Sequence, residues 1–258
     1  MTLPKITNKQ IEILNLIYKY RFLNRTQIQA FLNHKYHKRI IDWLKDLTEK
    51  EYLNRIYPNS AVIVMSPTIY YAGINAIRYF KSLDQDNNGY LKKLYRDNER
   101  TENFIAEQLL IADSGLHLIE RNKKRGIHYE FLTAADVTSN SIYKFMEDLS
   151  PQLIYTRKTK SEFKQFVFVI LDSAQPKYMI KKKMKNYLEL FYANEWEENI
   201  GKPFPTILFA CQTMALMIYA KRSMKGLLND YQEPEDFDAW FSTNDKIRDQ
   251  GISAEIWE

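Results

Sequence analysis

Residues that could hold a divalent metal ion surround one apolar segment, residues 163–172. Glu162 and Lys164 lie on either side of a phenylalanine, and Asp172 ends the segment. Carboxylate oxygens are ligands that Mg²⁺ prefers, and a bound ion can orient and activate a water molecule. If the chain reverses just before this segment, Glu162 lies about six residues from the position opposite Gln152, on the order of 20 Å along the strand. Glu162 is then at the wrong end to share a metal ion with Asp172.

Other patterns that carry chemistry are missing from the sequence. There is no glycine-rich phosphate loop, no nucleophile elbow and no cysteine/histidine cluster. His34 and His37 have no cysteine or carboxylate at ligand spacing, and His117 and His128 are isolated. The single cysteine, Cys211, can form neither an internal disulfide nor a cysteine-rich metal site. We therefore expect no catalytic residue, no metal site and no cofactor.

The charge is unevenly distributed along the chain. The net charge is +5, but residues 226–258 contain nine acidic and two basic residues, a local balance of −7. The remaining residues, 1–225, therefore carry +12. A basic body of this kind is typical of proteins that bind a polyanion such as DNA, although a merely solvated basic surface is the alternative.

The sequence contains no stretch that we expect to cross or enter a membrane. The longest apolar stretch, residues 205–220, is interrupted by Gln212 and Thr213 and is too short to span a bilayer. The first residues have no apolar stretch behind them that would form a secretory signal. We expect a cytoplasmic protein with no membrane partner.

The first part of the chain has the pattern of a winged helix-turn-helix. Capping boxes at Thr7 and Asn24 predict helices over residues 7–20 and 24–32, and the apolar positions Tyr36, Ile40, Trp43, Leu44 and Leu47 predict a third helix over 35–50. Residues 52–57 and 61–65 follow as a predicted β-hairpin. In that fold the third helix enters the major groove and the hairpin lies along the DNA backbone. The candidate DNA contacts are Arg25, Asn33, Lys35, His37, Lys38, Arg39, Lys45 and Arg55.

A polar stretch over residues 84–89 predicts a domain boundary. Before it, residues 66–68 are expected to cap a helix that runs to Lys81 with Gly73 inside it. We expect a winged-helix domain over 1–83, a linker over 84–89, a second domain over 90–230 and an acidic C-terminal tail over 231–258.

The second domain alternates predicted helices and strands. Helices are expected over residues 90–112, with a break near 97–98, and over 176–196 and 214–228; strands are expected over 116–120, 129–132, 151–156, 163–172 and 205–211. Together with the first domain this predicts an α+β protein whose second domain is α/β with a small mixed sheet. The candidate DNA contacts of this domain are Arg157, Lys158, Lys160, Lys177, Lys181, Lys182 and Lys185.

This order of elements resembles the replication-relaxation proteins of plasmids and conjugative elements. The resemblance is carried by residues 64–68 with Gly73 beyond, by the strand that begins at Pro151, by residues 168–172 and 204–209, and by Lys183 with Tyr187. It implies a winged helix followed by a restriction-endonuclease-like domain, and a role in plasmid replication, DNA relaxation or mobilisation.

Nucleases of the restriction type hold their metal with an aspartate at the opening of one strand and an acidic residue on the next. Here the matching positions are Gln152, predicted to pair with Phe168 or nearby, and Ile170. Only Asp172 remains as a vestigial carboxylate, and Ala174 stands where a lysine would be needed. An amide and an aliphatic side chain cannot supply the charge that holds Mg²⁺, so we expect no nuclease activity.

Three functions remain open at this point. The first is a non-catalytic accessory factor of a mobile element that binds double-stranded DNA with both domains. The second is a winged-helix transcriptional regulator whose second domain dimerises or senses a partner, and the third is a metal-dependent nuclease. A homodimer and a replication or relaxase partner protein are also left open.

Overall fold

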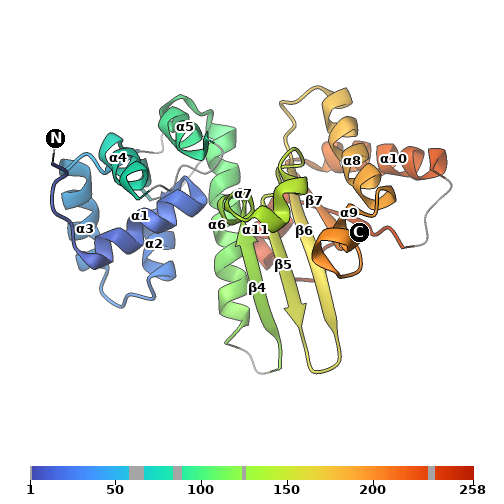
Figure 1. The fold of residues 1–258 in the computed structure, drawn as a ribbon, viewed down its shortest axis with the longest axis horizontal. Helices are drawn as coiled ribbons and strands as arrows, with labels where there is room; N and C mark the ends of the chain where they lie inside the picture. The colour runs from blue at the N-terminus through green and yellow to red at the C-terminus, as the bar shows by residue number, and fades with distance from the viewer. Residues whose placement is uncertain (1, 58–66, 84–88, 124–125, 232–235) are drawn as a thin grey trace. The chain divides into compact units, whose positions relative to one another are not determined.

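The computed structural model describes residues 2–57, 67–83, 89–123, 126–231 and 236–258. The chain forms two compact units, Met1–Leu116 and His117–Glu258, which are treated separately below (Figure 1). Among the described residues, no helix has both the length and the apolar character that a membrane span requires.

Capping boxes begin the first two helices of unit 1, as predicted. In α1 (Asn8–Tyr20) the Thr7 N–H donates to Gln10 Oε1 at 2.8 Å, and in α2 (Arg25–Phe31) the Asn24 N–H donates to Gln27 Oε1 at 3.0 Å. Both glutamines are buried and also bond to a later helix. Gln10 Nε2 donates to Asp46 of α3 (His37–Glu49), and Gln27 Nε2 donates to the Leu109 carbonyl oxygen at 2.9 Å in α6 (Glu102–Arg121).

A three-stranded antiparallel sheet completes the core of unit 1 in the order β1-β3-β2. Strands β1 (Leu23–Asn24) and β2 (Leu53–Ile56) flank β3 (Ile69–Ala72). The predicted helix from residue 68 is therefore wrong at its start, because residues 69–72 pair with two strands. Its helical part is α4 (Ile74–Ser82), which Gly73 precedes as N-cap. The strand predicted over 61–65 lies outside the described residues.

Close packing against the backbone requires a glycine at position 73. A Cβ at this position would lie 2.4 Å from the carbonyl oxygen of Glu51, and the Gly73 N–H donates to the Tyr52 carbonyl oxygen at 2.8 Å. The glycine therefore lets β3 turn into α4 against the backbone that follows α3.

Residues 90–116 pack with the first unit. The break expected near 97–98 is present: α5 (Tyr90–Tyr95) continues into a 3₁₀ turn (Arg96–Glu99), and α6 then begins at Glu102. Asp97 is fully buried in this turn and forms an ion pair with Arg21 at the end of α1. The compact units divide within α6, whereas the linker predicted from the sequence lies at 84–89, of which 84–88 fall outside the described residues.

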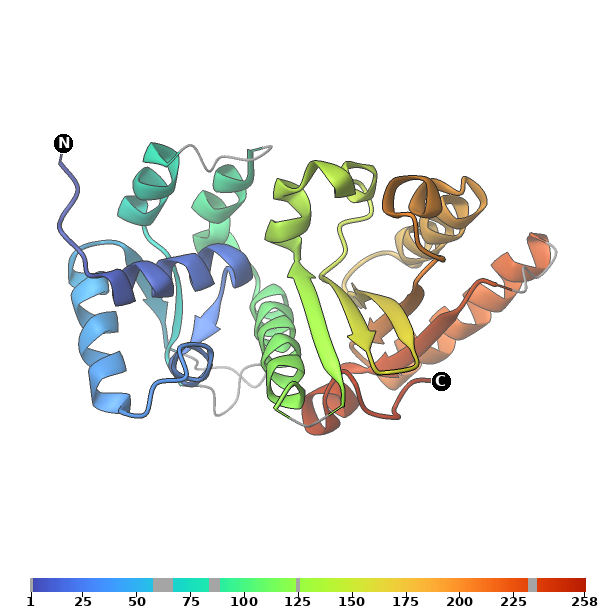
Figure 2. The same ribbon diagram turned by 60° about the horizontal axis from the view of Figure 1, so that its bottom comes forward.

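Unit 2 is built on a five-stranded mixed sheet in the order β4-β5-β6-β7-β8 (Figure 2). The first three strands, β4 (His128–Thr133), β5 (Leu153–Lys158) and β6 (Phe163–Leu171), are antiparallel neighbours. The next two, β7 (Thr206–Cys211) and β8 (Ala239–Thr243), run parallel to β6 and to each other. With the sheet of unit 1, this confirms the predicted α+β class.

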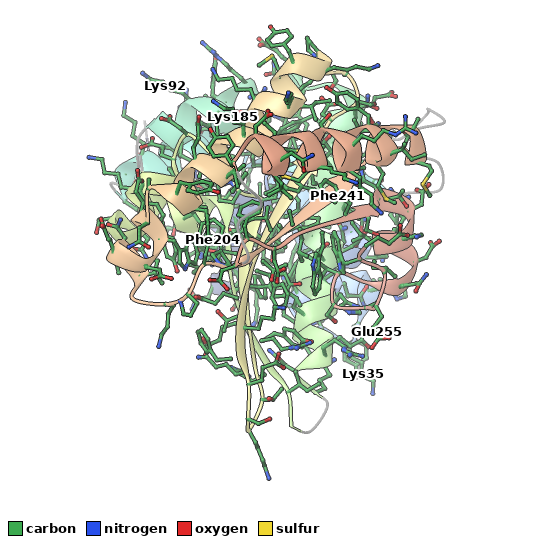
Figure 3. All side chains as sticks on the ribbon, turned by 90° about the vertical axis from the view of Figure 1, so that its right-hand side faces the viewer. Lys35, Lys92, Lys185, Phe204, Phe241 and Glu255 are labelled. Carbon is green, nitrogen blue, oxygen red and sulfur yellow. The ribbon has the colours of Figure 1, made fainter. Side chains whose placement is uncertain are left out.

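One face of this sheet packs into the main core of unit 2. Its alternate residues Val167, Val169 and Phe209 are fully buried against α8 (Lys177–Tyr192) and α10 (Met214–Asp230). Phe204 and Phe241, labelled in Figure 3, belong to the same hydrophobic core. Short helices α7 (Ala134–Ser139), α9 (Glu195–Ile200) and α11 (Asn244–Gln250), and a 3₁₀ segment (Ser141–Met146), complete the unit.

Two expectations for unit 2 are wrong. Residues 116–120 form the last turns of α6 and no strand, because Leu118 continues the buried helical face of Ile111 and Gly115 does not interrupt it. The C-terminal segment is no acidic tail: it contributes β8 and α11 and buries Phe241 and Ile252 between its charged residues.

The Arg21–Asp97 ion pair supports a prediction about stability. Burial raises the pKa of Asp97, although the neighbouring Arg21 and Arg100 lower it. Arg21→Gln should reduce the free energy of unfolding by about 3–5 kcal/mol at pH 7, because the carboxylate stays buried without its main partner. A carboxyl group whose pKa is raised by folding stabilises the folded state as the pH falls, so the loss should shrink at about pH 4.

Urea unfolding at the two pH values measures this effect, and Arg100→Gln is the matched control. The Arg100 side chain is one-third exposed and lies 3.6 Å from Asp97, so its loss should be under about 1 kcal/mol. Equal losses in the two variants, or a loss in Arg21→Gln that does not depend on pH, would contradict this assignment.

Candidate nucleic-acid interface

The side of α3 that faces solvent, together with Lys35 just before the helix, carries most of the candidate contacts in unit 1. Ile40, Leu44 and Leu47 are fully buried on the other side of the helix. Asp42 and Glu49 are the acidic residues among the exposed positions of α3, and Lys45 pairs weakly with Glu49 at 3.8 Å. Within the described part of the chain, Lys35, Lys38 and Arg39 have no ion pair. The exposed basic residues of this α3 surface are Lys35, His37, Lys38, Arg39 and Lys45.

The turn between α2 and α3 is fixed by local contacts. Asn33 has a φ of 47°, a left-handed conformation that asparagine tolerates better than most residues. Gln29 Nε2 donates to the His34 carbonyl oxygen at 3.0 Å, and the His34 ring contacts the Trp43 ring with centroids 5.1 Å apart. These contacts give Asn33 and His34 a structural role in holding the start of α3.

Tyr36 was predicted to belong to the buried apolar face of the third helix, and this prediction is wrong. The helix begins at His37, so Tyr36 is its N-cap with extended backbone, and the residue is 65% exposed. It lies one position too early to share the buried face with Ile40. Its ring instead lies 5.7 Å from the Lys35 ammonium group, in the exposed α3 surface.

Arg25 and Arg55, which are distant in the sequence, approach the same tyrosine. Arg55 lies opposite Tyr70 in the β2–β3 pairing, and the Arg25 N–H donates to the Thr68 carbonyl oxygen at 3.3 Å. Burial raises the pKa of Tyr70, and the charges of Arg55 and Arg25 act to lower it. The Arg55 guanidinium also lies 5.3 Å from the ring of Tyr57, and the residues that follow lie outside the described ranges.

Tyr70 was missed as a site residue, because the sequence predicted a helix there. Alternation of apolar residues over only four positions gives a weak strand signal. The signal that could have found it is the β-branched and aromatic run at 69–71.

The basic turn of unit 2 is largely neutralised by nearby carboxylates. Arg157 donates to Glu162 at 2.7 Å, and Lys158 donates to Glu130 at 2.7 Å. The hydrogen bond from Lys158 lowers the pKa of Glu130. Lys160 is exposed at the turn and, among the described residues, forms no ion pair.

Helix α8 presents a second basic surface. Lys177, Lys181 and Lys182 are exposed, whereas Lys185, labelled in Figure 3, pairs with Glu189 at 2.7 Å. Helix α8 begins beyond the carboxyl end of β6, whereas the basic turn precedes the amino end of β6. In Figure 1 the turn lies at the bottom and α8 near the top, so the two basic groups form separate patches.

Gln152, which stands at the expected position of a nuclease metal ligand, forms hydrogen bonds with the backbone of β6. The Gln152 N–H donates to the Phe168 carbonyl oxygen at 3.0 Å, which confirms the predicted pairing, and Gln152 Oε1 accepts from the Ile170 N–H at 2.8 Å. Lys183 donates to the Ile170 carbonyl oxygen at 3.1 Å. Asp172 Oδ1 accepts from the N–H two residues later at 2.8 Å.

Glu162 lies in the turn at the far end of β6, as expected from the pairing. The described residues contain no group of three or more histidine, cysteine, aspartate or glutamate side chains that could hold a metal ion. The candidate positions in the described residues offer exposed positive charge, with aromatic rings beside Lys35 and Arg55.

These features define an α+β protein with exposed basic side chains on both of its units. The chain belongs to the replication-relaxation family, whose model matches residues 14–206, well over half of its length. This confirms the resemblance seen in the sequence and points to a role in replication or relaxation. No curated protein and no solved structure matches the chain.

Proposed function

We propose that this protein is a DNA-binding accessory factor of a plasmid or other mobile element that acts in replication, relaxation or mobilisation without its own catalysis. Unit 1 is proposed to be a winged helix that binds double-stranded DNA, with α3 in the major groove. The observation that carries the proposal is the α3 surface, where Lys35, Lys38 and Arg39 are exposed while Ile40, Leu44 and Leu47 fix the opposite face in the core.

Arg25 and Arg55 extend this positive surface beyond α3. Arg25 begins α2, where the positive end of the helix dipole favours a phosphate. Arg55 precedes the segment that would form the wing, and its stacking on Tyr57 leaves the guanidinium on the surface. Both residues suit contacts to the sugar-phosphate backbone, which position a protein on DNA.

Unit 2 is proposed to bind DNA with α8 and to lack nuclease activity. Lys177, Lys181 and Lys182 supply charge that is not used in an ion pair with another described residue. The absence of activity is supported by Gln152, whose amide oxygen accepts a backbone N–H at the position where a carboxylate would bind a metal ion. Asp172 is then a single carboxylate, too little to hold Mg²⁺ against water.

The first prediction for this function concerns α3. Replacing Lys35, Lys38 and Arg39 together with alanine should weaken DNA binding and lower the slope of log affinity against log salt by about one unit for each lost phosphate contact. Fluorescence anisotropy over a range of salt concentrations measures both quantities.

A matched control removes Lys92, Lys93 and Arg96, three exposed basic residues of the same unit. The control should retain nearly the full affinity. If the folded α3 variant binds DNA as well as the unchanged protein does, or if it loses no more affinity than the control variant, α3 is not the contact surface.

Arg55→Ala tests the assignment of roles within unit 1. It should weaken binding to all DNA sequences similarly, because a backbone contact carries no sequence information. Affinities for a preferred site and for a scrambled duplex should fall by the same factor. A changed ratio between the two would mean that Arg55 contacts base edges.

Replacing Lys177, Lys181 and Lys182 with alanine tests unit 2. The variant should bind duplex DNA more weakly and with a smaller salt slope. Supercoiled plasmid incubated with the unchanged protein and Mg²⁺ or Mn²⁺ should remain uncut. Full affinity in the variant would show that α8 is only a solvated face, and metal-dependent nicking that disappears in Asp172→Ala would establish a nuclease.

A further inference from the structure

The second face of the five-stranded sheet in unit 2 contains a cavity of about 350 Å³. Tyr155, Phe166 and Trp240 line it from three different strands, and their neighbours in sequence point to the opposite core. Trp257, from the segment after α11, lines it as well. The volume is in the range of small-molecule sites, and none of the DNA-binding positions proposed on α8 contributes to it.

Five of the eleven residues that line the cavity are aromatic, and contacts fix the positions of several of their rings. The Tyr155 and Phe166 rings stack with centroids 4.7 Å apart and an interplanar angle of 17°. The Trp240 ring has the Lys164 ammonium group 4.7 Å from its centre, and the Trp257 indole N–H donates to the Ile252 carbonyl oxygen at 2.9 Å. Rigid aromatic faces of this kind bind a planar ring by stacking.

Polar groups of the lining lack partners among the described residues. The hydroxyl groups of Tyr129 and Tyr155 form no hydrogen bond there, although both residues are more than nine-tenths buried. Arg157 uses Nη2 to bond Glu162, but its Nε–H is buried without an acceptor. The buried Arg157 Nε–H and the two tyrosine hydroxyl groups thus place three donors around one cavity, which suits a ligand rich in acceptor atoms.

The charges around the cavity limit which ligand fits. The Arg157 side chain is 34% exposed and pairs with Glu162 through Nη2, so the donor that it leaves for an acceptor atom of a ligand is its Nε–H. Glu255, labelled in Figure 3, also lines the cavity and opposes a large negative charge. Burial raises the pKa of Tyr155 well above its ordinary value, so its hydroxyl remains a donor at neutral pH. A planar ring with acceptor atoms and a single phosphate meets all of these requirements.

We propose that this cavity binds a nucleotide, with the base against the aromatic rings and the tyrosine hydroxyls, and the phosphate beside Arg157. A free nucleoside monophosphate and a nucleotide of single-stranded DNA present the same chemistry to this cavity. This site is independent of duplex binding by α3, so the alanine variant at Lys35, Lys38 and Arg39 should retain it.

The test is calorimetric titration of the full-length protein with deoxyadenosine monophosphate, deoxyadenosine and inorganic phosphate. The monophosphate should bind and saturate at one site per chain, and the two fragments should bind much more weakly. Trp240 and Trp257 are two of the four tryptophans, so binding should also quench the intrinsic fluorescence. No saturable binding of the monophosphate, or equal binding of deoxyadenosine or inorganic phosphate, would overturn the proposal.

Variants of the lining residues test whether the monophosphate binds in this cavity. Arg157→Gln should weaken monophosphate binding by about tenfold or more, because a charged hydrogen bond is lost, and should leave deoxyadenosine unaffected. Tyr155→Phe removes only one hydroxyl group and provides a second test if Arg157→Gln unfolds. Arg222→Gln, at an exposed position of α10, is the matched control and should bind normally. Unchanged binding in both cavity variants would overturn the assignment of nucleotide binding to this cavity.

Competition with a short oligodeoxyadenylate distinguishes the two sources of the ligand. Displacement of the monophosphate by the oligonucleotide assigns the cavity to a base of single-stranded DNA. A monophosphate that stays bound in the presence of excess oligonucleotide assigns it to a free nucleotide.

Discussion

The alternation of side chains along β6 is the constraint on which unit 2 depends. This central strand pairs with β5 on one side and β7 on the other, and its last six residues are buried on both faces of the sheet. Val167 and Val169 pack into the core with α8 and α10, while Phe166 faces the cavity and Phe168 contacts Trp257. A shift by one residue would exchange the two sets, so the same register maintains both the hydrophobic core and the cavity.

The length of β6 also keeps the charged groups at its two ends far apart. Nine residues span roughly 30 Å in a strand, with Glu162 and the basic turn at the amino end and Asp172 at the carboxyl end. At the carboxyl end, Gln152 and Lys183 both bond to the backbone of Ile170. These side chains stabilise the end of the strand.

Local signals predicted the elements of unit 1 that begin with a cap, and non-local pairing decided the rest. The glutamines of the two capping boxes were visible in the sequence, but their second bonds, from Gln10 to Asp46 and from Gln27 to Leu109, were not. Residues 69–72 were assigned to a helix because their strand character depends on β1 and β2, which lie far away in the chain. Tyr36 was misplaced only because helix α3 begins one residue later than its periodicity suggested.

The candidate surfaces follow the same division between local and non-local information. The exposed charges of α3 could be predicted, because a single amphipathic helix determines which side chains face solvent. The cavity could not, because Tyr155 and Trp240 come together only when β8 joins the parallel edge of the sheet, in a segment whose acidic composition suggested a tail. Composition describes the average polarity of that segment, whereas its apolar residues at 237, 241, 247, 252 and 256 determine that it folds. Since β8 supplies Trp240 and the segment after α11 supplies Trp257, the last part of the chain completes both the sheet and the cavity on its second face.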